Sequence, residues 1–208
     1  MKELNLNNLT RPEAFQTGIS KLVRKTVLNQ TSKIREPILD ACCGNGIFLL
    51  EYCAIVRNYH DVYGVDIDDD ALNEAKQLFQ DNLLKPPTLI THDVFELPFN
   101  DNYFQTVFCL NTLINIYPFE LVEKLILELY RVLKPDGRLF IDFRNKNNPL
   151  LNYTYRKNIE HSRLTTHAHK KSDFNHLLNL LSPGAVQFHP IGSPLPFLAK
   201  GYLMIIRK

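Results

Sequence analysis

The chain has 208 residues, of which 45% are hydrophobic, so it can bury one sizeable core, and its length favours a single domain. Lys and Arg (24) exceed Asp and Glu (22) by only two, which argues against a nucleic-acid-binding protein, because such proteins carry a larger and more clustered basic excess. The first residues lack the apolar core of a signal peptide, and no window reaches the roughly 18 apolar residues of a membrane span, so we expect no membrane contact. The four cysteines form no C-x-x-C, and we expect the reducing setting of a cytoplasmic protein.

Residues 1–35 form a polar lead-in with helical spacing of its apolar residues: Ile19, Leu22, Val23 and Val27. After it, short apolar runs alternate with helical patterns of roughly 10 to 15 residues, which predicts βαβ units and a parallel sheet. The runs are almost entirely apolar, as expected for strands that helices cover on both faces. The run LKPDG, residues 133–137, predicts a turn between a helix and the next strand.

Residues 144–171 interrupt this rhythm, because they are polar, aromatic and basic rather than alternately apolar. The segment SDFNHLLNLL then predicts a helix capped by Ser172 or Asp173. AVQFHP and KGYLMIIRK predict two final strands joined by a proline-rich loop.

The first candidate site is the run ILDACCGNG, residues 38–46, which ends a predicted strand and opens a predicted helix. Glycines at such a turn let a ligand approach the backbone N–H groups of the helix N-terminus, although a purely structural turn would look the same. A dinucleotide fingerprint needs a third glycine where Leu49 stands, and the G-K-[ST] of a phosphate loop is absent. Asp40 would repel a pyrophosphate and suits a ligand that carries a positive amine.

A second acid, Asp66, ends the next predicted strand, 20 residues after Gly46 (66 − 46 = 20). An acid at this position can accept both hydroxyls of a ribose, whereas its alternative role is a helix N-cap. The following acids, Asp68 to Asp70, are better explained by their favourable interaction with the helix dipole.

Together these motifs resemble those of the class I S-adenosylmethionine-dependent methyltransferases over roughly residues 36–143. The family's first motif is commonly D-x-G-x-G-x-G; Asp40, Gly44 and Gly46 match it, and Cys42 replaces the first glycine. Asp66 matches the acid of the second motif, and Asp93 the strand-end acid of the third. Later segments, LPFNDNYFQTVF and LYRVLKPDGRLFIDF, are also similar to the family, except that Gln105 stands where an aspartate is common.

The resemblance implies a Rossmann-like, doubly wound α/β fold with a seven-stranded, mostly parallel sheet of order 3-2-1-4-5-7-6, its last strand antiparallel and helices on both faces. It implies S-adenosylmethionine as cofactor and S-adenosylhomocysteine as product. The glycine loop would wrap the methionine part, Asp66 the ribose, and Ile67 and Asp93 the adenine. The implied cofactor-binding residues are Asp40, Ala41, Cys42, Gly44, Gly46, Asp66, Ile67, Asp93, Val94, Leu110 and Asn111.

We therefore expect one domain over residues 1–208, with a lead-in (1–35), a cofactor-binding core (36–143), a substrate-cap insertion (144–171) and a C-terminal helix and strand pair (172–208). The acceptor should bind beyond the carboxyl ends of the strands. The candidate substrate residues are Asn115, Tyr117, Tyr153, Arg156 and His169, and the candidate catalytic residues are His161, His167 and Tyr155. Helix capping and packing would also explain Asn115 and Tyr117, and a solvated loop would also explain the basic insertion.

Signatures of nucleic-acid methyltransferases, [DN]-P-P-[YFW] after the fourth strand and a Pro-Cys nucleophile, are absent, which favours a small-molecule acceptor. The cap histidines lack Cys or Glu partners at recognised ligand spacing, so we expect no metal. The predicted function is methyl transfer from S-adenosylmethionine to an N, O or C atom. The alternatives are a non-catalytic S-adenosylmethionine-binding module on the same fold and an RNA or protein methyltransferase.

Overall fold

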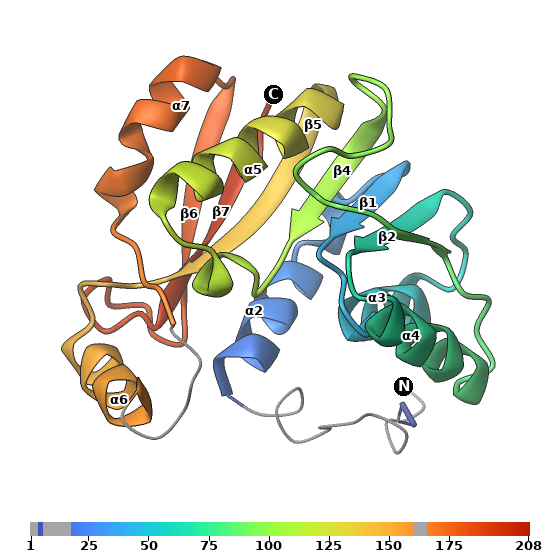
Figure 1. Ribbon diagram of the computed structural model, residues 1–208, viewed down its shortest axis with the longest axis horizontal. Coiled ribbons are helices and arrows are strands. Elements are labelled where there is room, and N and C mark those ends of the chain that lie inside the picture. The colour runs from blue at the N-terminus through green and yellow to red at the C-terminus, as the bar shows by residue number, and fades with distance from the viewer. Residues whose placement is uncertain (1–3, 6–17, 160–165) are drawn as a thin grey trace.

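The computed structural model describes residues 4–5, 18–159 and 166–208, and for residues 156–159 it describes the backbone alone. A seven-stranded sheet in the order β3-β2-β1-β4-β5-β7-β6 crosses the molecule (Figure 1). β7 runs antiparallel to both of its neighbours, and the other neighbouring pairs are parallel, so the predicted sheet order and strand direction are confirmed. The strands are β1 (Ile38–Ala41), β2 (Val62–Asp66), β3 (Thr88–Thr91), β4 (Phe104–Cys109), β5 (Leu133–Arg144), β6 (Ala185–Ile191) and β7 (Gly201–Arg207).

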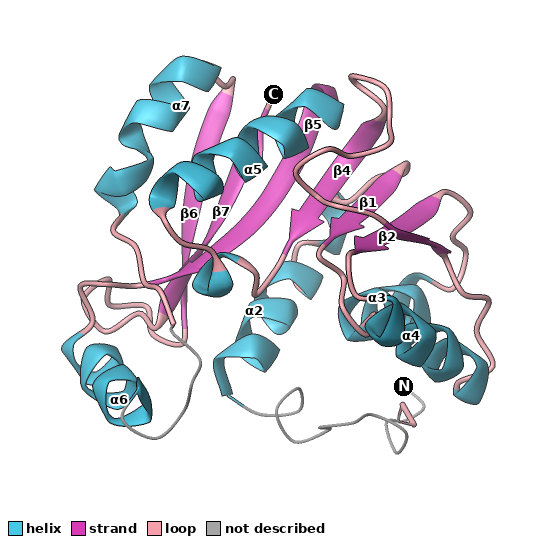
Figure 2. Cartoon of the chain, viewed as in Figure 1, coloured by secondary structure: helices cyan, strands magenta, loops and turns pink. Residues whose placement is uncertain are grey.

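Helices cover both faces of the sheet (Figure 2). The apolar side chains of α2 (Gly18–Leu28), α3 (Ile47–Val56) and α4 (Asp69–Asp81) join one core cluster. Those of α5 (Phe119–Val132) and α7 (Asn175–Leu181) join the other. The remaining described helices are α6 (Pro149–Ile159) and the short 3-10 helices η1 (Thr31–Lys33), η2 (Leu113–Asn115) and η3 (Lys171–Phe174). Among the described residues, no helix combines the length and apolarity needed to span a bilayer.

The cores explain why the apolar runs form central strands. All four residues of β1 are buried, because helices pack against the sheet on both sides. Phe108 and Phe140 fill the core on the α3 side, and Phe143 and Phe174 fill it on the α5 side. Each such side chain stabilises the fold by about 1.5–3 kcal/mol relative to exposure.

Two local predictions were wrong. LKPDG is not a turn before the strand: α5 ends at Val132 and β5 begins at the next residue. The register with β4 jumps from Leu133 to Arg138, so the proline and glycine form a bulge within β5, which lets the chain turn without leaving the sheet. Neither Ser172 nor Asp173 precedes a helix as its cap, because the chain already winds into η3 at Lys171, and the Asp173 carboxylate accepts the Lys170 N–H at 2.8 Å.

Residues 166–169 return to the carboxyl end of the sheet after α6. The His169 N–H donates to the carbonyl of Arg144 at 2.9 Å, and the His167 N–H donates to that of Ile114 at 2.8 Å. On the other side, the side-chain amides of Asn145 and Asn148 donate to backbone carbonyls of the loop between β6 and β7, at Pro196, Leu198 and Ala199. Three segments far apart in sequence are therefore joined beyond the end of β5.

Candidate functional site

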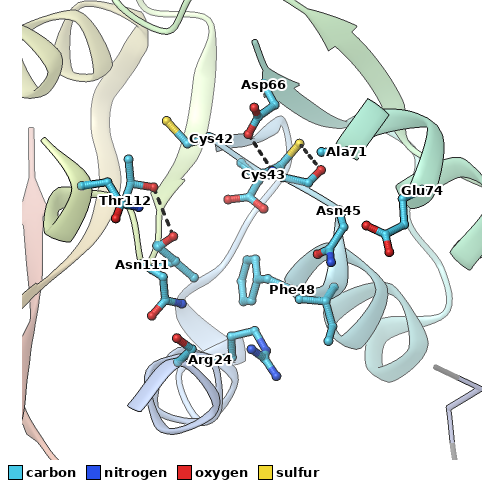
Figure 3. A pocket seen from close by; sticks show the side chains of 16 residues that line it. Arg24, Cys42, Cys43, Asn45, Phe48, Asp66, Ala71, Glu74, Asn111 and Thr112 are labelled. Carbon is cyan, nitrogen blue, oxygen red and sulfur yellow. Dashed lines mark hydrogen bonds between the residues drawn. The ribbon is translucent and has the colours of Figure 1, made fainter. Parts of the chain in front are cut away.

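A cavity of about 390 Å³ opens at the carboxyl ends of β1, β2 and β4 and is closed on one side by α2 (Figure 3). The sequence motifs meet there although they are distant along the chain. The lining includes the following predicted cofactor-binding residues: Asp40, Cys42, Gly44, Asp66, Leu110 and Asn111. The predicted substrate residue Asn115 lines the same cavity.

The loop after β1 has a left-handed backbone at three alternating positions, Cys42 (φ 58°), Gly44 (φ 51°) and Gly46 (φ 69°). This conformation is strained for residues with a side chain and easy for glycine. A Cβ on Gly46 would lie 2.9 Å from the Cβ of Ala75, so this glycine allows α3 and α4 to pack closely. A Cβ on Gly44 would meet nothing within 4 Å, because this glycine faces the cavity.

Asp66 shapes the loop from the neighbouring strand. Its Oδ2 accepts the Gly44 N–H at 2.7 Å, and its Oδ1 accepts the Asp68 N–H at 3.0 Å. A carboxylate has about four lone-pair sites, so two acceptor sites stay available to a ligand. The helix-capping role that the sequence left open for Asp66 belongs to Asp68, whose Oδ1 accepts the N–H groups of Asp70 and Ala71.

Asp40 lies at the end of β1, and only 3% of its surface is exposed. Burial, together with the negative charge of nearby Asp66, raises the pKa of this carboxyl well above its usual value. A cation bound at this cavity would therefore favour the ionised form of Asp40.

The helix α2 supplies a wall that sequence reasoning missed. Ser20 and Arg24 line the cavity from this side, and Figure 3 shows Arg24 across from Asp66. Arg24 is buried, and its Nε and Nη2 donate to the two carboxylate oxygens of Glu51 in α3 at 2.8 and 3.2 Å. The sequence signal for this role was an arginine directly beside Val23 on the apolar face of a predicted helix. Arg24 lies outside every motif, so the signal was missed.

Further lining residues also went unpredicted, namely Cys43, Asn45, Ile47, Phe48, Ala71, Glu74 and Thr112. Most of them lie within or directly after the sequence motifs. They reach the cavity because of where the backbone places them, and their residue types alone do not indicate a ligand-binding role. Cys43 is buried, and its N–H donates to the Val65 carbonyl at 3.1 Å. The adjacent cysteines thus shape the turn, and both line the cavity, Cys42 partly exposed and Cys43 buried.

Other predicted cofactor residues lie outside the cavity lining. Ala41 is fully buried, and Gly46 sits behind the loop. Ile67 is 72% exposed. Asp93 is exposed and accepts the Phe95 N–H at 2.9 Å, while Val94 is buried.

The other predicted substrate and catalytic residues that the structure describes lie outside the cavity lining. Tyr117 and His167 stack with ring centroids 4.6 Å apart and an interplanar angle of 14°. His169 is buried against Phe119 and Phe174, and burial lowers its pKa.

The other candidates lie on or after α6. Tyr153 is exposed. Burial raises the pKa of the Tyr155 hydroxyl, and the positive charge of Arg144 offsets part of this rise. His161 and the side chain of Arg156 lie outside the described residues. Within the described part of the chain, no group of three His, Cys, Asp or Glu side chains could hold a metal ion.

Residues 38–137 match the protein family described as a methyltransferase domain. A 2-phytyl-1,4-naphtoquinone methyltransferase of Trichormus variabilis is 34% identical over 119 residues, which are 56% of this chain and 51% of that protein. A demethylmenaquinone methyltransferase of Oceanobacillus iheyensis is 31% identical over 116 residues, 56% of this chain and 48% of that protein. The chain spans about half the length of these curated relatives.

Solved structures share the whole fold. A magnesium protoporphyrin IX methyltransferase from Synechocystis, crystallised with bound S-adenosylhomocysteine, superposes with a TM-score of 0.73 at 21% identity, covering 100% of this chain and 90% of that one. An S-adenosylmethionine-dependent methyltransferase from Archaeoglobus fulgidus gives 0.71 at 17% identity, with coverages of 94% and 97%. The family match covers residues 38–137, just under half of the chain, and these superpositions show that the whole chain has the fold of S-adenosylmethionine-dependent methyltransferases.

Proposed function

We propose that this chain binds S-adenosylmethionine in the cavity and transfers its methyl group to an N, O or C atom of a small-molecule acceptor. The observation that carries the proposal is the convergence of Asp40, Gly44 and Asp66 on one cavity of about 390 Å³. This volume falls in the range of small-molecule sites, roughly 300–1,000 Å³.

The lining side chains fit the two ends of this cofactor. Asp40 would meet the positive amine, because a cation offsets the cost of a buried carboxylate. Arg24, on the same cavity, supplies a cation for the carboxylate of the methionine part. Asp66 has acceptor sites left for the ribose hydroxyls.

We propose that the adenine lies beyond the cavity, over the ends of β2 and β3. The His92 N–H donates to the Asp66 carbonyl at 3.0 Å, which holds the segment of Asp93 and Val94 beside the end of β2. Ile67, 72% exposed, offers an apolar surface for a ring. Cofactor binding would then cover an isoleucine that is otherwise in water.

A bound S-adenosylmethionine supplies an electrophilic methyl group on a sulfonium, so the protein need only orient the acceptor and exclude water. A general base is needed only for an acceptor that must lose a proton. Of the candidates, His167 lies next to η2, whose Asn115 lines the cavity, whereas His169 packs into the core against Phe119 and Phe174. We therefore favour His167 over His169 for that role.

We propose that residues 144–171 cover the acceptor within a single-domain protein. The stacked rings of Tyr117 and His167 form an aromatic surface beside the cavity, which suits a planar acceptor. Two relatives are named for naphthoquinone-type and demethylmenaquinone substrates. A quinone or related aromatic ring is therefore the first acceptor class to test.

Two measurements test the proposal in order. Calorimetric titration should show one S-adenosylhomocysteine site per chain, and absence of binding would refute it. Release of S-adenosylhomocysteine from S-adenosylmethionine should then rise with a quinol or phenol acceptor in a panel. Binding without turnover on any acceptor would instead support a non-catalytic module, and turnover on RNA with strongly salt-dependent affinity would support an RNA methyltransferase.

A further inference from the structure

Two buried charges lie at the end of β5, directly behind the cavity wall. Asp142 and Arg144 are 1% and 3% exposed and alternate with the core residues Ile141 and Phe143 along the strand. The Arg144 Nη1 donates to the Asp142 Oδ2 at 2.5 Å. Such a pair adds little net stability compared with well-packed apolar residues, so its place in the core calls for another explanation.

Both charges bind the same cavity residue. The Asn111 N–H donates to the Asp142 Oδ1 at 2.5 Å, and the Asn111 Oδ1 accepts from the Arg144 Nη2 at 2.9 Å. Asn111 has a left-handed backbone (φ 58°), which is uncommon for a residue with a side chain. The ion pair thus fixes both the backbone and the side-chain amide of Asn111 where β4 ends and the cavity begins.

The Arg144 Nε is buried and has no hydrogen-bond partner among the described residues. The Nη1 and Nη2 of Arg144 carry the contacts to Asp142 and Asn111. The contacts of this cation therefore lead to the residue that lines the cavity.

We propose that Asp142 and Arg144 are positioning residues that set Asn111 for the acceptor. This inference rests on the proposed methyl transfer. Asn111 lines the same cavity as Asp40 and Asp66, so the effect of the pair on acceptor turnover is measured with the cofactor at saturation.

The main test replaces the ion pair by apolar residues in the double variant Asp142→Leu/Arg144→Met, which avoids an unpaired buried charge and so preserves folding. We expect kcat/KM for the acceptor, measured at saturating S-adenosylmethionine, to fall at least about tenfold. Arg138→Met is the matched control, because Arg138 lies on the same strand and donates to the Lys33 carbonyl, away from Asn111. An unchanged kcat/KM in the double variant would overturn the inference.

A cycle with Asn111→Ala separates positioning from a general structural effect. If the pair acts through Asn111, adding Asn111→Ala to the double variant should lower kcat/KM no further than Asn111→Ala alone. Fully additive losses would overturn the inference.

One readout is independent of turnover. The backbone amide resonance of Asn111 in a ¹⁵N-labelled sample should shift upfield in proton frequency in the double variant, because its N–H loses a carboxylate acceptor, and it should not move in Arg138→Met. An unmoved resonance contradicts positioning even in an active enzyme. A shifted resonance in a protein without turnover supports positioning and refutes the methyl transfer instead.

Discussion

The Asp66 carboxylate accepts the Gly44 backbone N–H at 2.7 Å, and this hydrogen bond joins the loop after β1 to the end of β2. The same carboxylate lines the cavity. One acid therefore has two tasks: it holds the glycine loop in shape and presents acceptor atoms to a ligand.

Asp66→Ala should weaken S-adenosylhomocysteine binding by at least about 100-fold, because it removes acceptors of charge-assisted hydrogen bonds that contribute about 1.5–3 kcal/mol each. Isothermal calorimetry measures the change. Asp70→Asn is the control, since Asp70 is exposed on α4 and does not line the cavity. Equal affinities of wild type and Asp66→Ala would place the ribose elsewhere.

Asp40→Asn should weaken cofactor binding and yet stabilise the free protein. The pKa of Asp40 is raised in the folded state by burial and by the Asp66 charge, whereas in the unfolded chain it stays near about 3.9. Its contribution to stability is therefore complete below that unfolded value and is lost as the pH rises through the folded pKa. At neutral pH the variant should melt at a higher temperature than wild type.

The same variant predicts a change in the pH profile of binding. In the wild type, affinity for S-adenosylhomocysteine should rise as the pH rises through the Asp40 pKa, because the ionised form attracts the amine. In Asp40→Asn this rise should be absent. Calorimetry at a series of pH values decides the point, and a profile shared by both proteins would assign the dependence to another group.

Gly44→Ala and Gly46→Ala should separate binding from stability. Each has a left-handed backbone, which costs an alanine about 1–2 kcal/mol. Gly46→Ala adds a contact of 2.9 Å with the Ala75 Cβ, so it should destabilise by about 2–5 kcal/mol in all. Gly44→Ala should destabilise less and instead weaken S-adenosylhomocysteine binding, because its methyl group projects into the cavity.

Gly18→Ala is the matched control for Gly44→Ala. Gly18 also has a left-handed backbone (φ 70°), a Cβ on it would meet nothing within 4 Å, and it lies outside the cavity lining. Both alanines should lower the thermal midpoint equally. Weakened ligand binding in both variants would mean that backbone strain, and not a blocked cavity, is the cause.

Arg24→Met should lower stability by about 2 kcal/mol, because it leaves the partly buried Glu51 carboxylate without its cation. Glu51→Gln in the same chain should restore part of this loss, and the double-mutant cycle measures the coupling. If Arg24 also serves the methionine carboxylate, the double variant stays folded but binds S-adenosylhomocysteine more weakly than Glu51→Gln alone. Purely additive stabilities would show that the pair is not coupled.

The strand-end acids could be predicted from sequence because each directly ends an apolar run and each has a side chain suited to one group of the cofactor, the amine or the ribose hydroxyls. Asp40 and Asp66 end apolar runs, and parallel strands bring their carboxyl ends to one edge. The sheet order came from the resemblance and not from periodicity, since alternating runs define a parallel sheet without ordering its strands.

The missed features depend on contacts between distant segments. Arg24 reaches the cavity only because α2 packs across the strand ends, and no local pattern encodes that placement. Arg144 and Asp142 resemble ordinary strand residues until the fold brings Asn111 against them. The bulge in β5 has the sequence of a turn because proline and glycine mark both, and only pairing with β4 tells them apart.

The position of β7 between β5 and β6 has a consequence for synthesis of the chain. β5 is made long before residues 201–207, so its edge facing β7 has no partner while α6, α7 and β6 emerge from the ribosome. An open edge of this kind can pair with other chains, and here it belongs to a strand that carries the apolar run Leu139 to Ile141 and Phe143. The nascent protein is therefore most exposed to aggregation in the interval just before its seventh strand is complete.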